Sequence, residues 1–106
     1  SEADAGISEA NASIEATRLM TASAIRENYS MLKSAERLMD LYKNALIPKA
    51  RQGYESSFSG YVTAKSELMG LIRNLSGLVE FEILYETQFV EREKAIARLY
   101  SLIGLK

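Results

Sequence analysis

The chain has 106 residues, of which 47% are hydrophobic and 25% are charged, and its formal net charge is −1 at pH 7. This length fits a single domain. Acidic and basic residues are interspersed, which argues against a surface that follows nucleic-acid phosphates. Cysteine and histidine are both absent, so disulfides, thiolate metal sites and Cys- or His-based catalysis are excluded.

The ends of the sequence and its hydropathy bear on where the chain comes from. No run of about 18 apolar residues is present, so no helix is expected to span a bilayer. The sequence begins abruptly at Ser1-Glu2-Ala3 without a recognisable signal peptide. We therefore interpret residues 1–106 as a single helical-hairpin fragment of a longer protein, which leaves its cellular location open.

The first predicted helix covers about residues 8–56, where apolar residues recur with helical spacing. Before Thr17 the pattern thins to small and polar residues, so fraying is expected there. Pro48 removes one backbone hydrogen bond, to the carbonyl of Asn44, and should bend the helix near Leu46. With Ile25 at heptad position a, the a and d rows hold Ile25, Asn28, Leu32, Ala35, Met39, Tyr42 and Leu46, and the g row holds Ala24, Met31, Leu38 and Ala45.

A lapse in helix-favouring sequence follows. Three serines and a glycine fall within the five residues 56–60, and Tyr61, Val62 and Thr63 are also weak helix formers. We predict a turn at about residues 57–62, in which Gly60 supplies a backbone conformation that other residues adopt only at a cost. The alternative is a kink in one very long helix.

The second predicted helix covers about residues 63–103 and ends at Gly104. With Leu68 at position a, nine of the eleven a and d positions are apolar, which predicts a coiled-coil seam. These positions hold Leu68, Leu71, Leu75, Leu78, Glu82, Tyr85, Phe89, Arg92, Ile96, Leu99 and Ile103. A second apolar stripe at positions b and e holds Met69, Ile72, Val79, Ile83, Val90, Ala97 and Tyr100.

These patterns predict an all-α fold, a long antiparallel helical hairpin of the coiled-coil type. The two stripes of the second helix are centred roughly 100° apart around its axis. One arm of a hairpin can cover only one stripe, so the second is expected to pack laterally against a further helix. This lateral packing stripe consists of Met69, Ile72, Val79, Ile83 and Val90.

Side chains with catalytic or ligand-binding chemistry are few. The acidic run from Glu80 to Glu93 is interpreted as a solvated face, and the methionines on the apolar stripes as core residues instead of copper ligands. Glu82 and Arg92 occupy predicted seam positions, where they either pair with polar groups across the interface or line a wet interior. No enzyme activity, metal or cofactor is expected.

Several sequence motifs together resemble the TolC-like outer-membrane efflux factors. The family commonly carries Leu-Tyr-x-x-x-Leu-Leu-Pro-x-Ala on its descending helix, and residues 41–50 read LYKNALIPKA. An aromatic residue, a glycine and a leucine eight residues later follow in the family; Phe58, Gly60 and Leu68 fit, although Phe58 stands two residues before the glycine and the usual distance is three. The family's return helix ends in Ala-x-x-x-Leu-x-x-x-x-Gly, which matches residues 95–104.

The resemblance covers roughly residues 15–104 and implies a trimeric outer-membrane protein of a Gram-negative bacterium. In that family long helical hairpins form a tunnel across the periplasm. This chain would be one such hairpin, and its tip would contact the periplasmic adaptor (membrane fusion) protein of a tripartite export pump. The tip residues carried over by the resemblance are Phe58, Gly60, Val62 and Leu68.

One departure from the family and one alternative remain. Family members often place Asp six and nine residues after the tip glycine, but Ser66 and Met69 stand there in this sequence, so an acidic gate ring is not expected. The alternative function is a soluble coiled-coil interaction module that dimerises into a four-helix bundle. Under either reading we expect the isolated chain to self-associate as a dimer or higher oligomer.

Overall fold

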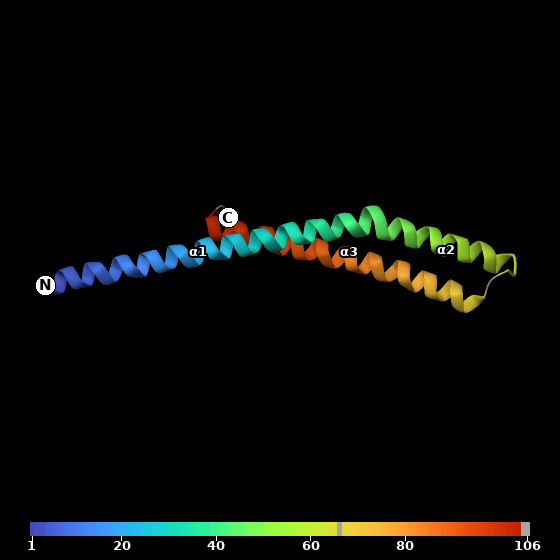
Figure 1. The fold of residues 1–106 in the computed structure, drawn as a ribbon, viewed down its shortest axis with the longest axis horizontal. Helices are drawn as coiled ribbons and strands as arrows, with labels where there is room; N and C mark the ends of the chain where they lie inside the picture. Colours follow the sequence, from blue (N-terminus) through green and yellow to red (C-terminus); the bar gives the residue numbers. More distant parts are fainter. Residues whose placement is uncertain (66, 105–106) are drawn as a thin grey trace.

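A computed structural model describes residues 1–65 and 67–104 and shows a helical hairpin (Figure 1). Three consecutive helices form one arm: α1 (Glu2–Leu41), the π-helix η1 (Tyr42–Leu46) and α2 (Ile47–Val62). The return arm is α3 (Leu68–Ile103), which runs back along all three. The molecule measures 90 × 22 × 17 Å. The predicted all-α hairpin is therefore confirmed.

Helix α1 begins at Glu2, six residues before the predicted start. The Ser1 side chain accepts a hydrogen bond from the Asp4 backbone N–H, and the acidic Glu2 and Asp4 side chains lie in the first turn, where the helix dipole favours negative charge. The expected fraying before Thr17 is not seen in the backbone. Residues 2–20 are nevertheless all exposed, because α1 extends beyond the end of α3 in Figure 1.

The bend predicted near Pro48 coincides with η1. The backbone N–H of Ile47 bonds to the carbonyl of Tyr42, five residues earlier, so the turn is wider than an α-helical one. Pro48 has no N–H to donate and its ring would crowd a regular turn, which the wider turn relieves. Figure 1 shows the first arm changing direction here.

The turn at the tip lies later than predicted. Residues 57–62, expected to form the turn, are the end of α2, and Gly60 is helical. The chain reverses between Thr63 and Glu67 instead, and α3 begins at Leu68 and not at residue 63. The weak helix formers of residues 56–60 each cost at most about 1 kcal/mol relative to alanine, which is not enough to end a helix whose neighbours hold it in place.

What ends α2 is a hydrogen-bonded cap. The N–H of Lys65 bonds to the carbonyl of Gly60 (2.7 Å), and that of Ala64 bonds to the carbonyl of Tyr61 (3.0 Å). These two bonds form a Schellman motif, whose left-handed residue is Ala64, at φ 60°. Glycine usually fills this position, so no residue type marks the end of the helix in advance.

On the first arm, the predicted seam is confirmed. Ala35 is buried, and the other a and d residues between Ile25 and Leu46 are half-buried. Tyr42 packs its ring against Phe81 of α3, with the ring centroids 6.1 Å apart.

On α3 only half of the predicted seam is correct. The d row faces the first arm, and its Leu78 is 6% exposed. The second buried row is g, which holds the buried Ala95 together with Phe81, and not a. At Ala95 the small side chain lets the helices approach closely, and the Phe81 ring packs against Tyr42 of the first arm. The predicted a residues Leu68, Leu75, Glu82, Phe89 and Ile103 are therefore exposed.

Candidate interaction surface

A groove lies along one face of the hairpin where the first arm bends. It has a volume of about 540 Å³ and an apolar floor. Ile47 comes from the first arm, immediately after η1, and the other lining residues come from α3. The lining residues are Ile47, Val79, Glu82, Ile83, Tyr85, Glu86, Thr87 and Val90.

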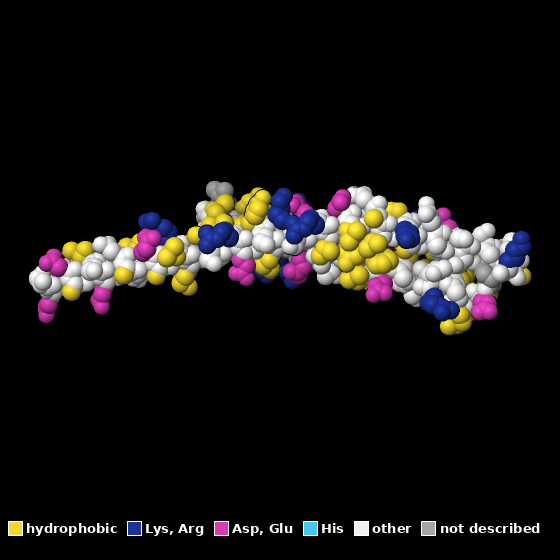
Figure 2. All heavy atoms as spheres, viewed as in Figure 1, with side chains coloured by type: hydrophobic (Ala, Val, Ile, Leu, Met, Phe, Trp, Pro, Cys, Tyr) yellow, Lys and Arg dark blue, Asp and Glu magenta, His cyan; other side chains and the backbone are white. Residues whose placement is uncertain are grey.

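The groove is part of a larger apolar face. A second hollow, of about 440 Å³, adjoins it along α3 and shares Val79 and Ile83 with it. Figure 2 shows hydrophobic side chains gathered over this part of the molecule, where the first arm bends alongside α3. We call the surface formed by Ile47, Leu75, Val79, Ile83 and Val90 the lateral face.

The lateral packing stripe predicted from sequence is exposed in the hairpin. Ile83 is 59% exposed, and Ile72, Val79 and Val90 are each exposed by nearly half. Met69, 60% exposed, lies nearer the tip. Because the a residues Leu68, Leu75, Phe89 and Ile103 of α3 are also exposed, the apolar surface is broader than the predicted stripe. Burying one such aliphatic side chain fully is worth about 1.5–3 kcal/mol.

The methionines do not form the core that was predicted for them. Of the three methionines on the apolar stripes, Met31 and Met69 are exposed and Met39 is half-buried. The hairpin is two helices thick, so a residue outside the single seam has nothing to pack against.

The predicted tip residues come together at one end of the hairpin, from two helices. Phe58 and Val62 are exposed on the last turns of α2, and Leu68 is exposed on the first turn of α3. The Phe58 ring lies against that of Tyr54, with centroids 6.2 Å apart. Gly60 is half-buried within the helix. Ser66, one of the two positions where the family's acidic pair is missing, lies outside the described residues.

Among the described residues, two ion pairs join the arms and account for the charged residues predicted at the seam. Arg92 Nε lies 3.3 Å from Glu36 Oε2, and Arg51 Nη2 lies 3.6 Å from Glu82 Oε1. The hydrogen bond from Arg92, assisted by Lys33, holds the pKa of the Glu36 carboxyl below its usual value. Glu82 and Arg92 are therefore paired across the interface, which is one of the two roles expected for them.

Two charged side chains beside the groove have no ion-pair partner among the described residues. They are Lys43 on η1 and Glu86 on α3. Lys43 lines a small hollow with Ile47 and Tyr85, and those two residues also line the groove that contains Glu86. The two unpaired charges thus lie on the same face and at the same level along the axis of the hairpin.

Nearer the tip, the arms are joined by polar contacts. The Asn74 side chain donates to the Gly53 carbonyl (3.4 Å) and to the Ser57 hydroxyl. A hollow of about 420 Å³ opens beside this contact, lined by residues that include Lys49, Gly77 and Phe81. A Cβ atom added at Gly53 or Gly77 would meet nothing within 4 Å, so these glycines are not required by close packing.

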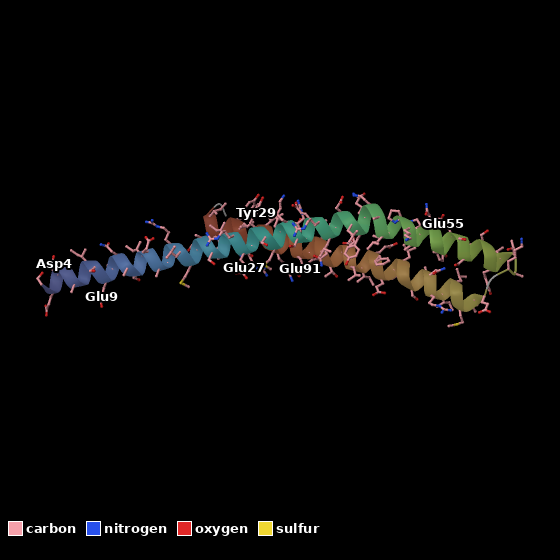
Figure 3. All side chains as sticks on the ribbon, in the orientation of Figure 1. Asp4, Glu9, Glu27, Tyr29, Glu55 and Glu91 are labelled. Carbon is pink, nitrogen blue, oxygen red and sulfur yellow. The ribbon has the colours of Figure 1, made fainter. Side chains whose placement is uncertain are left out.

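The side chains labelled in Figure 3 lie on different parts of the hairpin along its length. Asp4 and Glu9 lie on the part of α1 that α3 does not accompany, whereas Glu27, Tyr29 and Glu91 lie where α1 and α3 run side by side, and Glu55 lies on α2. Ile7, Ile14 and Leu19, on the unaccompanied part, are all more than half exposed.

Sequence reasoning missed Ile47, Lys43 and Glu86 as parts of a site. Ile47 follows an a position of the first helix and belongs to none of its predicted apolar rows. The wider turn of η1 changes the phase of the residues after it, and this brings Ile47 to the groove. The adjacent Pro48 signals a local disturbance, but not which side chain it redirects.

Comparisons with protein-family profiles, curated proteins and solved structures find no match to this chain. Within the described residues, no helix has the length and apolarity needed to cross a membrane. Those residues also contain no group of three His, Cys, Asp or Glu side chains able to hold a metal ion.

Proposed function

We propose that the chain is a wall segment of an outer-membrane efflux channel of the TolC-like kind. The hairpin forms part of the tunnel across the periplasm, and its tip, with Phe58, Gly60, Val62 and Leu68, contacts the adaptor protein of a tripartite pump. The role is structural and not catalytic. The motifs at residues 41–50 and 95–104 are the basis for choosing this family.

The observation that carries the proposal is the exposed lateral face of an elongated hairpin. In a free two-helix hairpin Val79, Ile83 and Val90 remain on the outside. Their exposure forfeits the free energy of burial and favours association with another molecule. In a closed wall of helices each hairpin has neighbours, and the lateral face is covered by the next one. The 90 Å length of the molecule suits a segment that extends across a wide compartment.

The test uses the full-length gene that encodes this chain. In a strain whose other outer-membrane efflux channels are deleted, removing this gene should raise the accumulation of ethidium several-fold, and the wild-type gene should restore export. The full-length protein should fractionate with the outer membrane as a trimer. Unchanged ethidium accumulation together with a cytoplasmic location would contradict the proposal.

The tip is tested separately in the same strain. Gly60→Glu places a charge on the half-buried face of the last turn of α2 and should abolish export while leaving the trimer intact. Ser23→Glu, at an exposed position of α1, is the matched control and should export normally. Normal export by the Gly60→Glu variant would remove the tip from the proposal.

A second candidate is a soluble interaction module that dimerises into a four-helix bundle. It is favoured by the concentration of apolar side chains and of the unpaired Lys43 and Glu86 on the same face. A face of this kind suits one partner of similar size.

A further inference from the structure

The lateral face is flanked by charges of opposite sign that have no ion-pair partner among the described residues. On its α3 side lies Glu86, near Glu82, whose carboxylate is already paired with Arg51. On its first-arm side lies Lys43. A surface whose two edges have opposite charge is complementary to a copy of itself turned by half a rotation.

We propose that two copies of this chain pair through the lateral face as a parallel dimer. The two-fold axis runs along the length of the hairpins, so that α3 of each copy lies over α1 and η1 of the other. Ile83 and Val90 of each copy are then covered, and Glu86 of each copy faces Lys43 of its partner. Both tips lie at the same end.

Charge selects this arrangement over an antiparallel one. A two-fold axis across the hairpins would place α3 against α3 near Ile83. The unpaired Glu86 of one copy would then lie near Glu86 of the other, and like charges across an interface are unfavourable. In the parallel dimer each helix also runs antiparallel to the helices that flank it, so that the helix dipoles of neighbours oppose each other.

The part of α1 that extends beyond α3 fits the groove less well than a second copy of the hairpin does. Residues 2–21 hold four acidic residues and a single basic one, Arg18. Against the acidic side of α3 this segment would be repelled.

The pairing holds for the 106-residue chain itself, whichever of the two proposed functions is correct, and it is tested without the full-length protein.

Charge reversal tests the pairing. Sedimentation equilibrium of the 106-residue chain should show a dimer, and Lys43→Glu or Glu86→Lys should each weaken it roughly tenfold, since two symmetric pairs are lost in each variant. The double variant Lys43→Glu/Glu86→Lys should return to within about threefold of the wild type, because the two positions are coupled. Helicity measured by circular dichroism should be unchanged in all three.

Lys49→Glu and Glu55→Lys are the matched controls. Lys49 lies beside a different hollow and Glu55 is exposed on α2, so neither change should alter dimerisation by more than about twofold. A monomer at millimolar concentration would overturn the proposal. So would a double variant no tighter than the single ones, or a loss of dimer in the controls equal to that in the test variants.

A spin label at Glu27→Cys tests the orientation, since the chain has no other cysteine. Residue 27 lies about 17 residues from the level of the groove, so an antiparallel pair would offset the two labels along the axis by about 50 Å. A parallel pair has no axial offset, and its labels should be separated only by the width of the bundle, roughly 20–30 Å. A distance of about 50 Å or beyond, which matches the antiparallel offset, would overturn the parallel dimer.

Discussion

The central part of the hairpin and its tip are held together in different ways. In the centre, where α1 and η1 meet residues 78–95 of α3, buried Ala35, Leu78 and Ala95 form the core, and the Glu36–Arg92 ion pair flanks it. In the tip no residue of α2 is buried. Its arms are joined through Asn74, and glycines stand along the contact.

The contrast between centre and tip shows that helical periodicity and packing strength are separate properties. Both regions have the sequence pattern of an amphipathic helix, and both are helical. Among the described residues only the centre has buried side chains, Ala35, Leu78 and Ala95, and the Tyr42–Phe81 ring pair lies beside them. The tip is the end at which the arms should separate most easily.

The largest effect should come from removing the one large side chain in the central core. Leu78→Ala should lower the free energy of unfolding by about 2–4 kcal/mol, since it leaves a cavity between the arms. Leu71→Ala, at the half-buried equivalent position in the tip, is the matched control and should cost about half as much. Urea unfolding followed by circular dichroism measures both, and equal losses would contradict the contrast between centre and tip.

The Schellman cap gives the next largest effect. Ala64 holds a left-handed conformation at φ 60°, which costs a residue with a Cβ roughly 1–2 kcal/mol. Ala64→Gly should therefore stabilise the hairpin by about 1 kcal/mol. Gly104, also left-handed at φ 76°, offers the reverse test: Gly104→Ala should destabilise it. Thermal unfolding at a fixed protein concentration measures both changes, and a loss of stability in Ala64→Gly would argue against this cap.

Replacing a glycine in the tip by alanine should increase the stability of the hairpin. Gly77 is helical and a Cβ there meets nothing within 4 Å, so Gly77→Ala should stabilise the hairpin by roughly 0.5–1 kcal/mol through helix propensity. The tip would then resemble the centre more closely, and amide hydrogen exchange around Asn74 should slow. A loss of stability in Gly77→Ala would show that the added methyl group meets a steric obstacle in the hollow beside it, and would contradict this prediction.

The smallest effect is the pH dependence of the central ion pair. The pKa of Glu36 is lowered in the folded chain, so its contribution to stability is present above the unfolded pKa of about 4.5 and is lost as pH falls through the folded value. Glu36→Gln should remove a small part of the loss of stability between about pH 5 and about pH 3. Identical pH profiles for the two chains would show that the pair contributes nothing measurable, as is common for exposed pairs.

Much of the fold was predictable from local pattern. The helical period predicted both arms, Pro48 predicted the bend, and the a and d rows between Ile25 and Leu46 predicted the seam of the first arm. The position of the turn was not predictable from composition. Residues 56–60 resemble a loop but are held helical, and Ala64 ends the helix without the glycine that usually marks such a cap.

The lateral face was predictable in part. The stripe from Ile72 to Val90 is exposed, as expected of a surface that awaits a neighbour, whereas the contributions of Ile47, Lys43 and Glu86 do not follow from the sequence pattern. Those residues come together through the wider turn of η1 and the antiparallel register of the arms. Neither is encoded in any short stretch of sequence.

By itself the sequence determined that the chain is helical, that it folds back on itself, and that its second arm is apolar on more than one side. Spacing alone fixes these properties, because helical periodicity is local. The tertiary structure decided which of α3's rows is buried. Rows a and g are both partly apolar and flank the same d row, and only the fit of Phe81 against Tyr42 and of Ala95 against the first arm selects g. That choice leaves row a outside, where Leu75 adds to the lateral face.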